Sequence, residues 1–155
     1  MRIALGSDEK SHVTDFVERE LRGRGHRVRL FGALAEPPEG PAWPDVAAAV
    51  AGAVTSGEAD EGVLFCWTGT GVSIAANKVR GARAALCGDA ETARGAKAWN
   101  QANVLCLSLR TTTETVAREV LEAWFSTSPD PAEAENVKKV DLLDERSRAT
   151  ASRVR

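Results

Sequence analysis

The chain is poor in the residues that most often bind metals or form disulfides. It has three cysteines, two histidines and no tyrosine among its 155 residues. Cys66, Cys87 and Cys106 stand about twenty residues apart without a CxxC pair, a pattern typical of neither a disulfide framework nor a zinc site. Neither His12 nor His26 has a partner at ligand spacing. We therefore expect no metal and no bound cofactor.

Long apolar runs and an excess of one charge are also absent. The apolar runs at 63–66 and 104–107 are far shorter than the ~20 residues that a membrane-spanning helix needs. The formal net charge of -2 gives no general attraction to nucleic acids or anionic membranes. The residues after Met1 lack the apolar stretch of a signal peptide. We expect a cytoplasmic protein with no nucleic-acid or membrane partner.

What is present is the composition of one globular domain. Hydrophobic residues make up 43% of the chain and charged residues 27%. A chain of 155 residues is the usual size of a single domain, which we place at 1–145. The last residues, 146–155, carry four arginines and little apolar content, so we expect a disordered basic tail there.

Strand and helix patterns alternate along the sequence. Apolar runs predict strands at 2–7, 26–31, 62–66, 83–87 and 104–109. Helical periodicity predicts helices at 13–23, 44–55, 73–79, 91–99, 113–126 and 132–145. This alternation predicts a Rossmann-like three-layer α/β/α sandwich with a five-stranded parallel sheet. Ligands of such sheets bind at the carboxyl ends of the strands, where Asp8, 66–71, 88–89 and Arg110 fall.

The strongest local motif is the run FCWTGTGVSIAANK at 65–78. It places a glycine-containing turn between a buried strand and a helix, which aims several backbone N–H groups at one point. Its spacing matches neither a Walker A loop nor GxGxxG. Two interpretations stay open: an anion or enolate site, or a merely structural turn. Cys66 is likewise either a base or nucleophile or a buried core thiol, and we assign Cys87 and Cys106 to the core.

Several motifs occur together in a recognisable order. They are Gly6-Ser7-Asp8, Trp43-Pro44-Asp45, the SGEAD run at 56–60, the 66–78 run, Arg83–Cys87 and the NQANVL run at 100–105. Over about residues 1–143 the chain resembles the ribose-5-phosphate isomerase B / galactose-6-phosphate isomerase family of sugar-phosphate isomerases. The resemblance implies metal-independent interconversion of an aldose and a ketose through a cis-enediolate. It also implies a homodimer or dimer of dimers with sites shared between subunits.

The same resemblance implies roles for individual residues. Cys66 falls on the position of the base that moves the proton between C1 and C2, and we place Thr68 beside it as catalytic. The turn at 68–71 falls on the loop whose amides hold the oxyanion. The expected substrate-binding residues are Asp8, Glu9, Trp43, Trp67, Gly69, Thr70, Gly71, Ser73, Trp99, Asn100, Arg110 and Lys139. We expect those of the turn, with Asp8 and Asn100, to line one pocket that has Trp67 and Trp99 in its wall.

Departures from the family pattern bear on the substrate. Trp99 stands where the family has the histidine assigned to ring opening. Glu135 replaces a phosphate-binding arginine, and Lys139 keeps a positive charge nearby. We therefore expect weak or absent activity on ribose 5-phosphate, and an acyclic substrate would need no ring opening. Trp43, Trp67 and Trp99 are interpreted either as sugar-stacking residues or as parts of a dimer interface, and Trp124 as core.

Two classes of function follow. The first is an aldose–ketose isomerase acting on a sugar phosphate, with an altered substrate, or on a related sugar that lacks the phosphate. The second is a catalytically impaired relative that binds a small polyol or sugar as a regulatory or scaffolding dimer. The intact Cys66 and glycine turn favour the first class. Glu9 and Trp99 stand where the family has histidines, and the loss of these histidines favours the second class.

Overall fold

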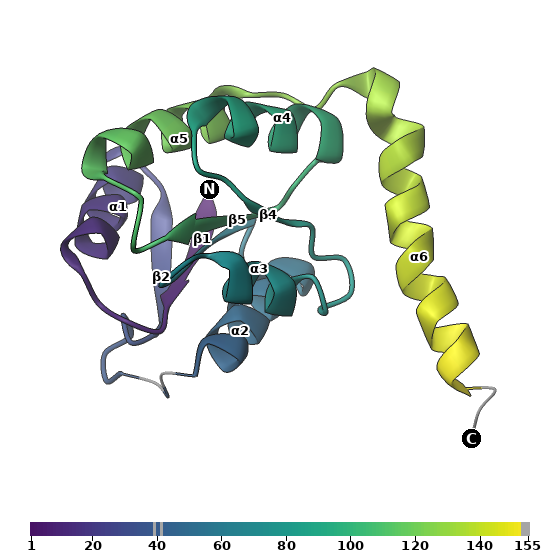
Figure 1. Ribbon diagram of the computed structural model, residues 1–155, viewed down its shortest axis with the longest axis horizontal. Helices are drawn as coiled ribbons and strands as arrows, with labels where there is room; N and C mark the ends of the chain where they lie inside the picture. The colour runs from purple at the N-terminus through teal and green to yellow at the C-terminus, as the bar shows by residue number, and fades with distance from the viewer. Residues whose placement is uncertain (39, 41, 153–155) are drawn as a thin grey trace.

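The computed structural model describes residues 1–38, 40 and 42–152. Strands and helices alternate from the N-terminus (Figure 1). The strands are β1 (Arg2–Ser7), β2 (Arg27–Gly32), β3 (Glu61–Cys66), β4 (Ala84–Leu86) and β5 (Val104–Ser108). The helices are α1 (His12–Gly23), α2 (Trp43–Thr55), α3 (Thr70–Ala76), α4 (Ala90–Asn100), α5 (Glu114–Ser126), the 3-10 turn η1 (Pro131–Glu133) and α6 (Ala134–Ser152).

The strands form one parallel sheet in the order β2-β1-β3-β5-β4. Ser7 of β1 is paired with Phe65 of β3, and Cys66 of β3 with Ser108 of β5. The strand order reverses between β1 and β3, which is the topological switch point where ligands of open α/β sheets bind. The predicted five-stranded parallel sheet is confirmed.

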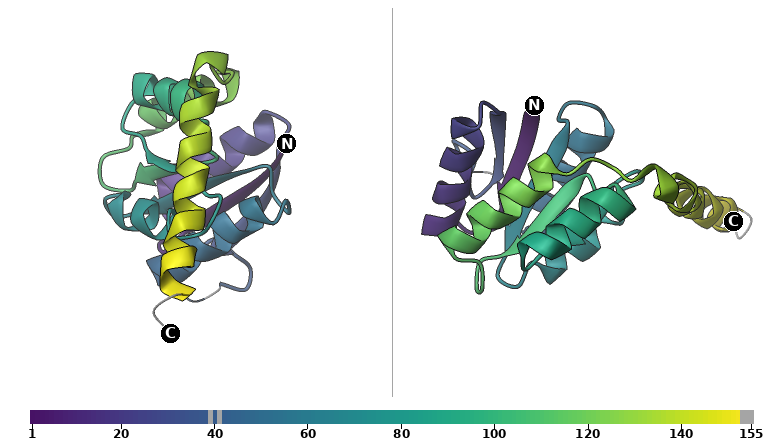
Figure 2. Two further views of the ribbon diagram at one scale, coloured as in Figure 1. Left: turned by 90° about the vertical axis from the view of Figure 1, so that its right-hand side faces the viewer. Right: turned by 90° about the horizontal axis from the view of Figure 1, so that it is seen from above.

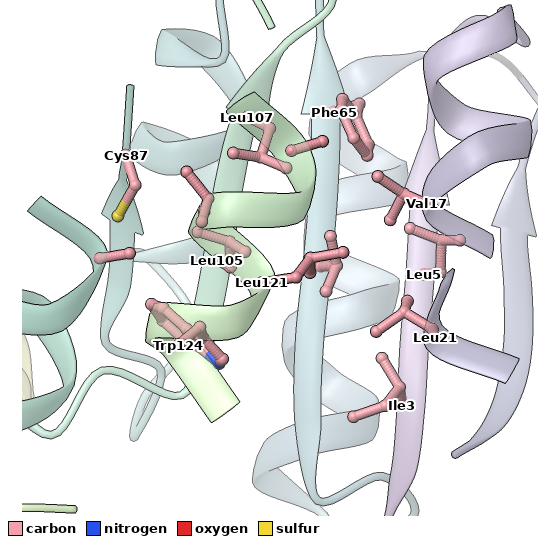
Figure 3. Close-up of a cluster of buried hydrophobic side chains, with 14 of the residues drawn as sticks. Ile3, Leu5, Val17, Leu21, Phe65, Cys87, Leu105, Leu107, Leu121 and Trp124 are labelled. Atoms are coloured by element: carbon pink, nitrogen blue, oxygen red, sulfur yellow. The ribbon is translucent and has the colours of Figure 1, made fainter. Parts of the chain in front are cut away.

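Helices cover both faces of the sheet, as Figures 1 and 2 show. One core cluster joins β1, β3 and β5 to α1, α4 and α5, and includes Leu5, Phe65 and Trp124 (Figure 3). The other joins the opposite face to α2 and α3. A Cβ at Gly6 would lie 2.7 Å from Val50 Cγ2, so this glycine lets α2 approach β1 closely. The three-layer sandwich is confirmed.

Helix starts follow local sequence chemistry. Thr113 Oγ1 accepts the Val116 N–H and so caps α5, and Pro44 lies in the first turn of α2. The third helix differs from its predicted span of 73–79, since α3 runs from Thr70 to Ala76. The reason is that Gly69, at φ 75°, completes the turn, which lets the helix begin directly after it.

The last helix, α6, stands beside the sandwich rather than in a layer (Figures 1 and 2). Polar contacts tie it to the segment after α3: Arg83 pairs with Asp141 at 3.1 Å, and the Gly81 N–H bonds Asp144 at 3.0 Å. The helix continues to Ser152, beyond the predicted end at residue 145. The predicted disorder of 146–155 stays a prediction, and 153–155 lie outside the described residues. Across the described part of the chain, no helix is both long and apolar enough to cross a membrane.

Candidate active site

The candidate site lies where β1, β3 and β5 end. Cys66 is the last residue of β3 and is 6% exposed, so its thiol lies at the margin of the core. The backbone after β5 folds against it: the Leu109 N–H donates to the Cys66 carbonyl at 3.0 Å. The Ser108 hydroxyl donates to the Trp67 carbonyl at 2.9 Å. These bonds fix the strand end from which the turn departs.

The turn after Cys66 can be built only around glycine. Gly69 has φ 75°, and a Cβ there would lie 2.5 Å from Leu86 Cδ1 and 3.0 Å from the Leu107 carbonyl. Its N–H donates to the Cys66 carbonyl at 3.2 Å, which closes the turn. The hydroxyls of Thr68 and Thr70 share a hydrogen bond at 2.7 Å. The first N–H groups of α3 have no acceptor within the helix, so they are available to an anionic oxygen.

The other two thiols are core groups, as predicted. Cys87 is 1% exposed, and burial raises the pKa of its thiol to about 12. Cys106 is fully buried, and burial raises the pKa of its thiol further. Both therefore stay protonated at neutral pH. Cys66 is the cysteine whose position at a strand end gives it access to the sheet edge.

Asp8 follows β1 at the same edge. Its Oδ1 is buried and has no hydrogen-bond partner among the described residues. Burial, with a smaller contribution from Glu9, raises the pKa of this carboxyl above its ordinary value. The Ser7 hydroxyl donates to the Glu9 carbonyl at 2.6 Å, which fixes the backbone around Asp8. Glu9 itself is exposed.

Three tryptophans are exposed, whereas Trp124 is fully buried in the core, as predicted. The Trp43 ring packs against Gly71 of the turn. A Cβ at Gly71 would lie 3.1 to 3.3 Å from three carbons of the Trp43 ring. Trp67 is 60% exposed directly after Cys66. Trp99 is 58% exposed at the end of α4, and its ring rests on Gly95, where a Cβ would lie 2.7 Å from Cζ3.

The predicted site residues fall into two groups within one chain. Trp99 and Asn100 line a cavity of about 500 Å³ between the β4 edge and α6, and neither Cys66 nor Thr68 lines it. Asp8 and the turn form the other group, with Ser73 half-buried on α3 and Arg110 exposed after β5. Lys139 is exposed on α6. The single shared pocket is thus not formed by one chain alone and stays a prediction for an assembly.

Sequence reasoning missed some residues around this cavity. Arg83, Asn77 and Asn136 also line it, although no local motif marks them as a group. Gly95 was detectable, since it lies four residues before Trp99 on the same helix face. Among the described residues, no three His, Cys, Asp or Glu side chains gather as metal ligands.

Comparisons with known proteins show which family the chain resembles. The family model described as Ribose/Galactose Isomerase matches residues 3–143. The D-erythrulose-4-phosphate isomerase of Pectobacterium atrosepticum is 35% identical over 130 residues, covering 81% of this chain and 82% of that protein. Ribose-5-phosphate isomerase B of Escherichia coli is 36% identical over 128 residues, covering 80% and 83%. The structure of Clostridium thermocellum ribose-5-phosphate isomerase B superposes with a TM-score of 0.87 at 34% identity, covering 95% and 99%.

Proposed function

The chain belongs to the ribose/galactose isomerase family, and from that premise we propose that it is an aldose–ketose isomerase of sugar phosphates in which Cys66 transfers the proton. One observation carries the proposal: the Cys66 thiol lies at the margin of the core, directly before a turn that requires glycine at position 69. The Cys66 thiolate removes the proton from the carbon next to the carbonyl and returns it to the neighbouring carbon. Preorganised N–H donors of the 68–71 turn hold the enediolate oxygens.

The substrate we propose is a tetrose 4-phosphate. One relative in the family is named D-erythrulose-4-phosphate isomerase. A four-carbon sugar with phosphate on O4 cannot close a furanose ring, because O4 would have to be the ring oxygen. Such a substrate is always open-chain and needs no ring-opening acid. An indole N–H does not act as such an acid, so Trp99 at the position of the family's ring-opening histidine fits an open-chain substrate.

We therefore expect the unmodified protein to favour D-erythrulose 4-phosphate over ribose 5-phosphate by at least ~10-fold in kcat/KM, which corresponds to ~1.4 kcal/mol. Steady-state kinetics with both substrates measures this preference. The variant Trp99→His/Glu135→Arg should gain ribose 5-phosphate turnover, because it restores an acid and a positive charge. Equal or faster turnover of ribose 5-phosphate by the unmodified protein would contradict the substrate assignment. Failure to isomerise either sugar would favour the binding-only alternative.

A homodimer with shared sites is part of the proposal, as is the predicted cytoplasmic location. Two observations support the dimer. The Trp99 cavity and the Cys66 turn are separate in one chain, and a second copy can bring one against the other. Exposed apolar side chains lie near both: Ile74 is 61% exposed on α3, and Val140 and Leu142 are 49% and 40% exposed on α6.

Light scattering should accordingly give about twice the chain mass of 16.5 kDa. The variant Leu142→Glu should shift the protein toward monomer and lower its activity, because a charge would have to be buried in the interface. Lys138→Glu changes charge at an exposed position of the same helix and serves as the control. A fully active monomer would contradict the shared site.

A further inference from the structure

Aldose–ketose isomerisation moves two protons, and Cys66 accounts for only one of them. The carbon-bound proton moves between C1 and C2. In the aldose-to-ketose direction O1 also gains a proton, while O2 loses one. A second group must donate to one oxygen and accept from the other, and its efficiency depends on reaching both protonation states near the working pH.

We infer that Asp8 is this second group, the acid–base residue that carries the proton between O1 and O2. The inference rests on the proposed isomerase function and adds a catalytic role to a residue for which the resemblance implies only sugar binding.

Strand register brings Asp8 beside Cys66. Ser7 and Phe65 are paired across β1 and β3, so the next residues along the two strands are Asp8 and Cys66. Neighbouring strands lie about 5 Å apart, so the residues that directly follow this pair leave the sheet close together at its carboxyl edge. The Ser7 hydroxyl donates to the Glu9 carbonyl and accepts from the Glu9 N–H. These two bonds connect the residues before and after Asp8 and fix the backbone at Asp8.

The carboxyl of Asp8 also has a free acceptor. Its Oδ1 is buried and unpartnered among the described residues, and a buried polar atom without a partner costs free energy unless a ligand satisfies it. Asp8 forms no ion pair with any of the described residues, whereas Arg2, Arg29 and Arg83 each hold an acidic partner. Burial raises the pKa of the Asp8 carboxyl, so the neutral, proton-donating form becomes more accessible.

The other groups at this edge fit the role less well. Both oxygens of Asp89 accept hydrogen bonds from Thr92, at 2.7 and 3.0 Å, which lowers the pKa of that carboxyl and keeps it ionised. The Arg110 guanidinium does not release a proton near neutral pH. Trp99 lies in the separate cavity beside α6, and its indole can donate a hydrogen bond but does not transfer a proton.

The step balances without a co-reactant. The Cys66 thiolate takes the C2 proton of the aldose, and the C1=O1 bond opens to the enediol as neutral Asp8 protonates O1. The Asp8 carboxylate then takes the proton from O2, the C2=O2 bond forms, and the Cys66 thiol returns its proton to C1. Thiolate and carboxylic acid are both regenerated.

The variant Asp8→Asn tests this assignment, because asparagine keeps the shape of the side chain and one acceptor oxygen but carries no transferable proton. With a ketotetrose 4-phosphate as substrate, kcat should fall about 100-fold and KM should change little. In deuterium oxide, Cys66 still exchanges the C1 proton of the substrate in this variant, although product formation is slow. The amount of deuterium in the recovered substrate, divided by the amount of product formed, should therefore rise. Asp8→Glu should restore part of the turnover. Asp15→Asn makes the same change on α1, at a carboxyl whose side chain is 42% exposed, and should leave turnover unchanged.

Each result has one meaning. Unchanged kcat in Asp8→Asn overturns the role, and so does a parallel fall of exchange and product formation, which marks a structural defect. If thermal unfolding shows that Asp8→Asn is not folded, Asp8→Ser is measured by the same deuterium ratio. An unmodified protein that isomerises neither the tetrose phosphate nor ribose 5-phosphate refutes the proposed function itself, and is thereby distinguished from a failure of the Asp8 assignment.

Discussion

Replacing Cys66 with alanine is expected to lower kcat by at least ~100-fold and by up to ~10⁴-fold, the range of a lost general base. KM should change little, because the turn amides and the remaining site residues still hold the substrate. Alanine fills most of the space of a thiol that is only 6% exposed, so the fold should be retained. Steady-state kinetics, with deuterium exchange from solvent into the substrate, measures the loss of proton transfer directly.

Cys87→Ala is the matched control for this variant. Cys87 is also a buried thiol beside the same sheet, but its raised pKa, about 12, keeps it protonated and unable to act as a base. Its replacement should lower stability slightly and leave kcat unchanged. Near-normal turnover in Cys66→Ala would exclude the base role, and equal losses in the two variants would indicate a packing effect.

The second large effect is expected at the opposite end of β3. Glu61 forms a buried ion pair with Lys97 of α4 at 2.6 Å, with both side chains less than 15% exposed, at 11% and 13%. The same carboxylate accepts the indole N–H of Trp124 on α5. Lys97 also donates to the Ala102 carbonyl at 3.1 Å and lies 4.9 Å from the Trp124 ring centroid. One carboxylate thus ties two helices to the central strand.

Glu61→Ala should therefore lower the free energy of unfolding by about 3–5 kcal/mol, because it leaves a buried ammonium and a buried indole N–H without their partner. Chemical denaturation with a measured m-value determines the loss. The neighbouring pair between Arg2 and Asp60 is exposed, so Asp60→Ala should cost far less.

A double variant separates the charge effect from lost packing. Glu61→Leu combined with Lys97→Met removes both buried charges and should recover part of the stability lost in Glu61→Ala. If Glu61→Ala costs no more than Asp60→Ala, the ion pair contributes little and the core alone holds the two helices to the sheet.

The sequence alone predicts the order of strands and helices, because that order depends on local patterns. Apolar runs and helical periodicity place all five strands and the helices α1 to α5 within a few residues of the observed bounds, whereas α6 extends past its predicted end. The FCWTGTG run shows that the turn after Cys66 depends on glycine, since backbone conformation at one position is a local property. Family membership likewise follows from short motifs in a fixed order, and the comparisons confirm it.

Only the tertiary structure decides which distant residues meet. The partnership of Glu61 with Lys97 and Trp124 joins three separate elements, and no sequence spacing connects them. The pairing of β1 with β3 decides that Asp8 and Cys66 each directly follow the Ser7–Phe65 pair. The separation of Trp99 from the Cys66 turn depends on where α4 ends relative to β3 and on the placement of α6. These relations depend on packing between residues far apart in the chain, and such packing leaves no periodic signal in the sequence.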